Sequence, residues 1–105
     1  MTPKETSTES VVDTVRRVQA GEPAAFADLV RRFQDFAVGY AWSHLKDHHL
    51  EEEVAQDAFI QVLGDLKDLH EPAAFPGCLR RIVHKHSDRR TRRAQLPTVT
   101  LEGLE

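Results

Sequence analysis

The residues best suited to a chemical task are cations gathered near the end of the chain. Residues 76–95 hold seven Lys/Arg against one acid, whereas residues 1–75 hold seven Lys/Arg against fourteen Asp/Glu. At helical spacing, an outward-facing band is formed by Arg80, Arg81, His84, Lys85 and Arg92 together with Asp88, and Arg89, Arg90 and Arg93 extend the charge at the C-terminal end. Phosphate groups suit such a band, because each neutralised phosphate releases counterions. The helix dipole explains one or two arginines near a helix C-terminus, but not a band over several turns.

A second outward face lies on the preceding helical segment. At 100° per residue, the side opposite its apolar stripe carries Glu53, Gln56, Asp57, Ile60, Gln61, Gly64, Lys67 and Asp68. An apolar centre inside a polar rim is typical of a small docking surface. Single exposed aliphatic residues are also common on surfaces without a function. The residues alone therefore leave both interpretations open.

The remaining reactive side chains do not form a set suited to catalysis or metal binding. His44 and His48 have the spacing of a shared ligand face, but their helix is expected to end near residue 47, and we expect His44 to be packed. His84 and His86 point to opposite sides of a helix. Cys78 is expected to be a buried small hydrophobe. Because no paired carboxylates, triad or phosphate loop can be assembled, we expect no enzymatic activity, no cofactor and no metal site.

Four stretches with helical periodicity must position these surfaces. They cover residues 9–20, 23–46 and 50–66, and a last stretch that begins at Pro72 or Pro76 and runs to about residue 93. Gly21 suits the end of the first helix and Pro23 the first turn of the second. The residues after 66 are expected to form a loop. The predicted fold class is all-α, a compact bundle of about four helices.

Length and composition fit one small helical domain. The chain has 105 residues, 40% hydrophobic and 30% charged, and its apolar runs are too short to cross a bilayer. The N-terminus has no apolar signal core, and a single cysteine permits no internal disulfide, so we expect a cytoplasmic location without membrane contact. The expected organisation is a disordered tail over 1–8, a helical domain over 9–93 and the start of an interdomain linker over 94–105.

Three segments together resemble the region 2 domain of extracytoplasmic-function sigma factors of the sigma-70 family. LEEEVAQDAFIQVLGDLKDL is similar to the polymerase-binding helix of that family, with the pattern E-D-x-x-Q-E-x-F-L-x-x-W. GEPAAFADLVRRFQDFAVGYA resembles the family's first conserved segment, and AFPGCLRRIVHKHSDRRTRR resembles its DNA-binding helix. The three occur in the family's order and spacing. Two usual tryptophans of the family are replaced here by Leu63 and Cys78.

The resemblance implies two roles for this domain in transcription initiation. The first is docking on the clamp coiled coil of the largest subunit of core RNA polymerase, through Glu53, Gln56, Asp57, Ile60 and Gln61. The second is recognition and melting of the −10 promoter element. For the non-template strand, the implied contacts are Asp68 and His70 in the loop 67–74 and the last-helix residues Arg80, Arg81, His84, Lys85, Arg89 and Arg92. The family's helix-turn-helix domain for the −35 element is not expected within this sequence.

Other functions stay open from the residues. A helical protein-interaction module could bind polymerase, or an anti-sigma regulator, without reading DNA, and would not need the basic band. A duplex-DNA binder would place the last helix in the major groove, but no short turn-linked helix pair with recognition spacing precedes that helix.

Overall fold

Helices make up most of the described chain. The computed structural model describes residues 9–95, and side chains of residues 9–93. The helices are α2 (Val11–Gln19), α3 (Pro23–Leu45), α4 (His48–Asp65) and α5 (Phe75–Gln95), and two short 3-10 turns, η1 (Leu66–Asp68) and η2 (Pro72–Ala74), separate α4 from α5. No strand occurs within these residues. The prediction of an all-α bundle of about four helices is therefore confirmed.

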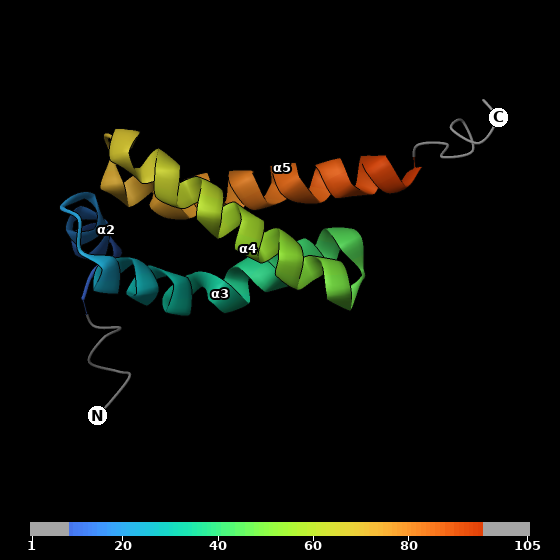
Figure 1. The fold of residues 1–105 in the computed structure, drawn as a ribbon, viewed down its shortest axis with the longest axis horizontal. Coiled ribbons are helices and arrows are strands. Elements are labelled where there is room, and N and C mark those ends of the chain that lie inside the picture. The colour runs from blue at the N-terminus through green and yellow to red at the C-terminus, as the bar shows by residue number, and fades with distance from the viewer. Residues whose placement is uncertain (1–8, 96–105) are drawn as a thin grey trace.

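The three long helices pack against one another, and α2 covers one end of the bundle. Figure 1 shows α3 and α5 running along the molecule, with α4 crossing diagonally between them. The short helix α2 contacts α3 and both 3-10 turns. Because α4 packs on α3 and α5 together, its outward face adjoins that of α5.

Local signals define the ends of the first two helices, and those at Gly21 and Pro23 were predicted from the sequence. The Ser10 side chain accepts a hydrogen bond from the Asp13 backbone N–H at 3.0 Å and so caps α2. Gly21 has a φ of 94°, a left-handed conformation that suits glycine, and it turns the chain between α2 and α3. Pro23 then occupies the first turn of α3, where its missing N–H costs no helical hydrogen bond.

The helix α4 begins two residues earlier than predicted. The Asp47 carboxylate accepts from the backbone N–H groups of His49 at 2.8 Å and of Leu50 at 3.1 Å. This cap starts the helix at His48, so the predicted start at residue 50 is wrong. The connection between α3 and α4 consists of Asp47 and Lys46, and Lys46 has a left-handed φ of 54°.

The predicted loop after α4 is more ordered in its backbone than expected, because it contains η1 and η2. The Gln19 side-chain amide donates to the carbonyls of Leu66 and Leu69, both at 2.9 Å, and ties this segment to α2. The last helix places Pro76 in its first turn, one of the two predicted alternatives, and continues to Gln95. The expected tail over 1–8 lies outside the described residues, as does the expected linker over 94–105 except for residues 94 and 95, which belong to α5.

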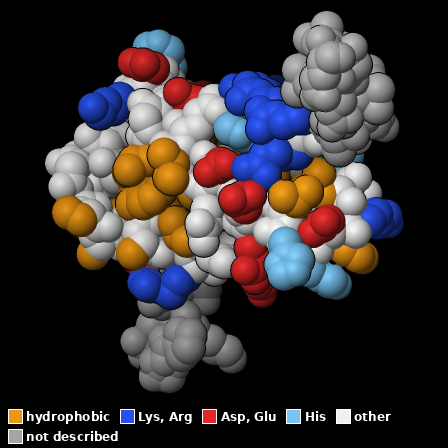
Figure 2. Space-filling view, turned by 45° about the vertical axis from the view of Figure 1, so that its right-hand side comes forward, with side chains coloured by type: hydrophobic (Ala, Val, Ile, Leu, Met, Phe, Trp, Pro, Cys, Tyr) orange, Lys and Arg blue, Asp and Glu red, His pale blue; other side chains and the backbone are white. Residues whose placement is uncertain are grey.

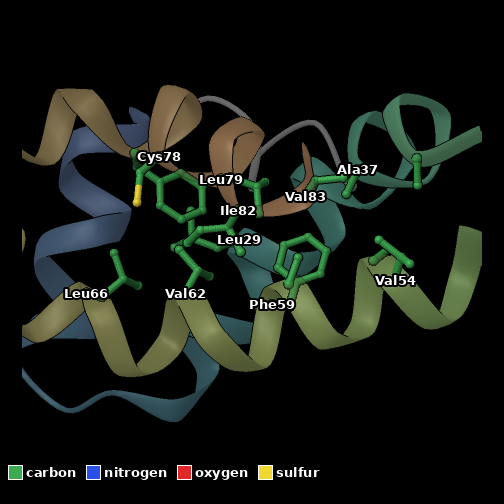
Figure 3. Close-up of a cluster of buried hydrophobic side chains, with 14 of the residues drawn as sticks. Leu29, Ala37, Val54, Phe59, Val62, Leu66, Cys78, Leu79, Ile82 and Val83 are labelled. Atoms are coloured by element: carbon green, nitrogen blue, oxygen red, sulfur yellow. The ribbon is translucent and has the colours of Figure 1, made fainter. Parts of the chain in front are cut away.

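One hydrophobic cluster joins the helices. Figure 3 shows side chains of α4 directed toward those of α5 and α3. The fully buried large side chains include Leu29, Leu66, Phe75 and Leu79. The ring of Phe75 meets the ring of Phe33 edge to face, with centroids 5.1 Å apart. The apolar stripes read from the sequence are therefore the core, and the opposite faces are left for solvent or partners.

The core predicts a contrast between two phenylalanines. Phe75→Ala should lower the free energy of unfolding by about 3–5 kcal/mol, because Phe75 is fully buried and its removal leaves a cavity. Phe36→Ala should cost about 1 kcal/mol or less, because 41% of Phe36 is already exposed. Urea unfolding followed by circular dichroism measures both. Equal losses for the two variants would contradict the packing described here.

Candidate functional site

The outward face of α4 presents the residues predicted for docking. We call these five residues the docking face: Glu53, Gln56, Asp57, Ile60 and Gln61. Ile60 is 70% exposed, although it lies on a helix whose other large aliphatic and aromatic residues are mostly buried. Glu53 and Gln56 are exposed, whereas Asp57 and Gln61 are half-buried. The structure thus places the five residues on one surface, with an apolar centre and polar neighbours.

Asp57 and Gln61 are half-buried because α5 contacts this face. The Arg90 guanidinium donates to the Glu53 carboxylate at 2.7 Å and lies 3.3 Å from the Asp57 carboxylate. The Nε2 atom of His86 lies 2.7 Å from the side-chain carbonyl oxygen of Gln61. Three residues of the docking face are therefore already engaged by the neighbouring helix.

The Arg90 bridge was not predicted from the sequence, which grouped Arg90 with the cations at the end of the helix. Its side chain is 22% exposed, and the carboxylate side chains of Glu53 and Asp57 are 57% and 43% exposed. Ion pairs in such partly solvated settings contribute about 0–1 kcal/mol. The Arg90 bridge therefore adds little to the stability of the fold.

The environment of His86 lowers the pKa of its imidazole. Partial burial is the main cause, because it disfavours the charged ring, and the cations Arg89 and Lys85 add repulsion. The nearby Asp57 acts in the opposite direction but does not dominate. His86 is therefore expected to be neutral near pH 7, with its Nε2–H donating to Gln61.

The predicted phosphate contacts on α5 all lie on the exposed side of the helix. We call this set the basic band: Arg80, Arg81, His84, Lys85, Arg89 and Arg92. Figure 2 shows Lys and Arg side chains gathered beside acidic ones on the visible face. Arg92 is paired with Asp88 at 3.2 Å, one turn earlier on the same helix. The other four Lys/Arg members make no ion pair within the described residues, which leaves them available to an anion.

His84 also takes part in an aromatic cluster on α3. Its Nδ1 atom lies 3.3 Å from Nε2 of His44 and 3.4 Å from the Tyr40 hydroxyl. The expectation that His44 is packed is wrong, because His44 is exposed near the end of α3. The cluster links α3 to α5 and fixes one member of the basic band against the bundle.

The loop residues predicted to contact bases lie on a segment that is anchored on both sides. Asp68 and His70 are exposed, whereas Leu66 and Pro72 on either side of them are buried. Together with the contacts of Gln19, this burial holds the loop backbone while its two polar side chains face solvent.

The histidines and the cysteine lie in separate structural environments. No group of three His, Cys, Asp or Glu suited to a metal ion occurs in the part of the chain that the structure describes. His48 contacts the Glu51 carboxylate at 2.9 Å and stacks on Trp42 with centroids 4.5 Å apart. Cys78 is buried as predicted, and this burial raises the pKa of its thiol.

Comparisons with known proteins give no assignment. The chain matches no protein-family model, no curated protein and no solved structure. Within residues 9–95, no helix is long and apolar enough to cross a membrane.

His86 predicts a pH dependence of stability. Its folded-state pKa lies below the ordinary value of 6.5, so the unfolded chain binds more protons as the pH falls. The free energy of unfolding should therefore have its full value above about pH 6.5. It should decrease as the pH falls below this value and stop decreasing once the folded-state pKa is passed. Urea midpoints at about pH 7.5 and about pH 5.5 measure this decline.

A matched pair of variants isolates the contribution of His86. His86→Gln keeps a donor for Gln61 but cannot titrate, so it should reduce the decline between the two pH values. His49→Gln, on an exposed histidine, should leave the decline nearly unchanged. If the stability of His86→Gln falls between the two pH values as much as that of the parent chain, other titratable groups cause the decline.

Proposed function

We propose that this chain is a sigma region 2 domain of the extracytoplasmic-function type, which docks on the RNA polymerase clamp and recognises the −10 element. The observation that carries the proposal is the pairing of two unlike surfaces on adjoining helices, the docking face on α4 and the basic band on α5. Their order along the chain agrees with the family motifs that the sequence resembles. The proposal requires no cofactor or catalytic group and implies a cytoplasmic location.

Docking is proposed to replace the ion pairs of Arg90 with ion pairs to the partner. A cationic side chain of the clamp coiled coil would take the place of Arg90 at Glu53 and Asp57. Ile60, at 70% exposure, would supply apolar contact in the centre of the interface. Charge-assisted pairs with carboxylates give orientation as well as affinity, so the acidic rim would set how the partner helix lies.

DNA contact is proposed to use the basic band and the anchored loop. Single strands are held by a cationic track together with a site for an unstacked base. Arg80, Arg81, Lys85 and Arg89 are exposed and free of ion pairs among the described residues, so they supply the track. Asp68 and His70 are the proposed base contacts. The energy for opening DNA would come from binding and would be shared with the polymerase.

A second candidate function is an interaction module that binds polymerase, or an anti-sigma regulator, without reading DNA. Two residues favour this second candidate. Where the family carries tryptophan, this chain has Cys78, which is buried, and Leu63, which is aliphatic. Neither side chain offers an aromatic surface on which a base could stack. The docking face serves both candidates equally. DNA binding by the basic band separates them.

The docking proposal predicts opposite effects for two charge changes. Asp57→Arg should weaken binding of a purified clamp coiled-coil fragment roughly tenfold or more, because it places a cation against the partner's cations. Arg90→Gln should preserve or strengthen binding, because it frees both carboxylates from their internal partner. Titration of the fragment into the fluorescently labelled chain measures both, with circular dichroism as the folding control. Weaker binding by Arg90→Gln would contradict the proposed replacement of Arg90 by a cation of the partner.

The DNA proposal predicts a change in salt dependence. Arg81→Glu combined with Lys85→Glu should weaken binding to a single-stranded −10 oligonucleotide and lower the salt slope by about 1.4, since each lost phosphate contact removes about 0.7. Arg16→Glu with Lys46→Glu changes the net charge equally but lies outside the basic band, and should have a much smaller effect. If the two double variants behave alike, the interaction-module function is favoured.

A further inference from the structure

An apolar hollow lies beside the docking face. It has a volume of about 670 Å³ and separates the α2–α3 turn from the C-terminal half of α4. Its facing walls are formed by Val18, Pro23 and Phe26 on one side and by Ile60, Leu63 and Gly64 on the other. Figure 2 shows a group of hydrophobic side chains on the left of the visible face and a smaller group on the right, with charged side chains between them.

Exposed hydrophobic residues concentrate at this hollow. Among the described residues, three large hydrophobics are exposed, and two of them, Ile60 at 70% and Leu63 at 43%, border it. Isolated exposed aliphatics need no explanation, but adjacent ones around a concavity are typical of an interaction site. The docking face therefore continues into a second, apolar part that the sequence motifs did not indicate.

The wall formed by α4 is open to close approach. A Cβ atom added at Gly64 would meet no atom within 4 Å apart from its own helix and chain neighbours. The missing side chain leaves the helix backbone accessible at the hollow, where a partner can come nearer than at other positions. Gly64 is exposed and follows Leu63 directly, so the close approach and the apolar wall coincide.

The charges around the hollow define the chemistry of the occupant. Its lining holds one acid, Glu22, which is paired with Arg17 at 3.0 Å, and one cation, Lys67. Two further acids, Glu53 and Asp57, lie outside the lining, earlier on α4. An occupant that is both apolar and cationic complements this surface. An amphipathic helix with an apolar anchor, flanked by Arg or Lys, meets both requirements.

We propose that the hollow receives a leucine or aromatic side chain of the same basic helix that docks on α4; this inference rests on the function proposed above. The partner helix would lie along α4 from Glu53 to Lys67, a length of about 21 Å. Its cations would face Glu53 and Asp57, and its apolar anchor would follow about two turns away, opposite Leu63 and Gly64. Burial of the anchor would then supply affinity that the solvated ion pairs cannot.

Two glycines provide a test variant and its matched control, because Gly64 lines the hollow and Gly39 does not. In Gly64→Leu the new Cβ would meet no existing atom, the rest of the side chain would occupy part of the hollow, and a helical glycine is replaced with a better helix former. Gly39→Leu makes the same change at an exposed glycine of α3 that also has free space and does not line the hollow. Both variants should unfold at the same or a higher temperature than the parent chain. Leu63→Ser tests the same wall by removing apolar surface instead.

The probe is the purified polymerase clamp coiled-coil fragment, titrated into each variant and monitored by anisotropy. Gly64→Leu and Leu63→Ser should weaken binding roughly tenfold or more, the loss expected for one apolar anchor, whereas Gly39→Leu should bind like the parent. Unchanged affinity in both hollow variants would overturn the inference and leave the proposed docking intact. Absence of binding by the parent chain would overturn the proposed function together with this inference.

Self-association is a separate outcome of the same experiment. If the unbound parent chain forms a concentration-dependent dimer in sedimentation, and Gly64→Leu is monomeric, the occupant is a second copy of this chain. That result would overturn the assignment of the hollow to a basic partner helix.

Discussion

The packing of α4 against two helices at once constrains both candidate surfaces. Its inner stripe is buried against α3 and α5, so only an arc of the helix is left for contact with other molecules. The edge of that arc lies against α5, which brings Asp57 and Gln61 within reach of Arg90 and His86. The acidic face and the basic helix are consequently joined by direct contacts.

The sequence was sufficient to predict the helices and the buried side of each, because helical periodicity indicates which side chains face the core. It missed the start of α4, where the Asp47 cap outweighs the polar appearance of the junction. It also missed the Arg90 bridge and the hollow, since both depend on contacts between residues distant in the chain. His44 fits the apolar stripe of α3 by spacing, yet it lies near the helix end, where the core no longer covers it.

The two candidate surfaces also differ in the forces available to them. The basic band offers mainly cationic side chains, so its contacts would act at a distance and be tolerant of sequence. The docking face combines carboxylates with Ile60, Leu63 and the hollow, so it can bury apolar surface around a few oriented charges. Such a division suits a domain that holds a protein by shape and a polyanion by charge.

The ion pairs that Arg90 forms within the chain have a thermodynamic consequence for docking. An arginine of the partner that displaces Arg90 breaks one set of ion pairs while it forms another, so the number of ion pairs at Glu53 and Asp57 hardly changes. Added electrolyte weakens the old and the new pairs alike. The proposed docking equilibrium would therefore be nearly indifferent to ionic strength. Concentrated salt could then strip nucleic acid from this domain while leaving its protein partner in place.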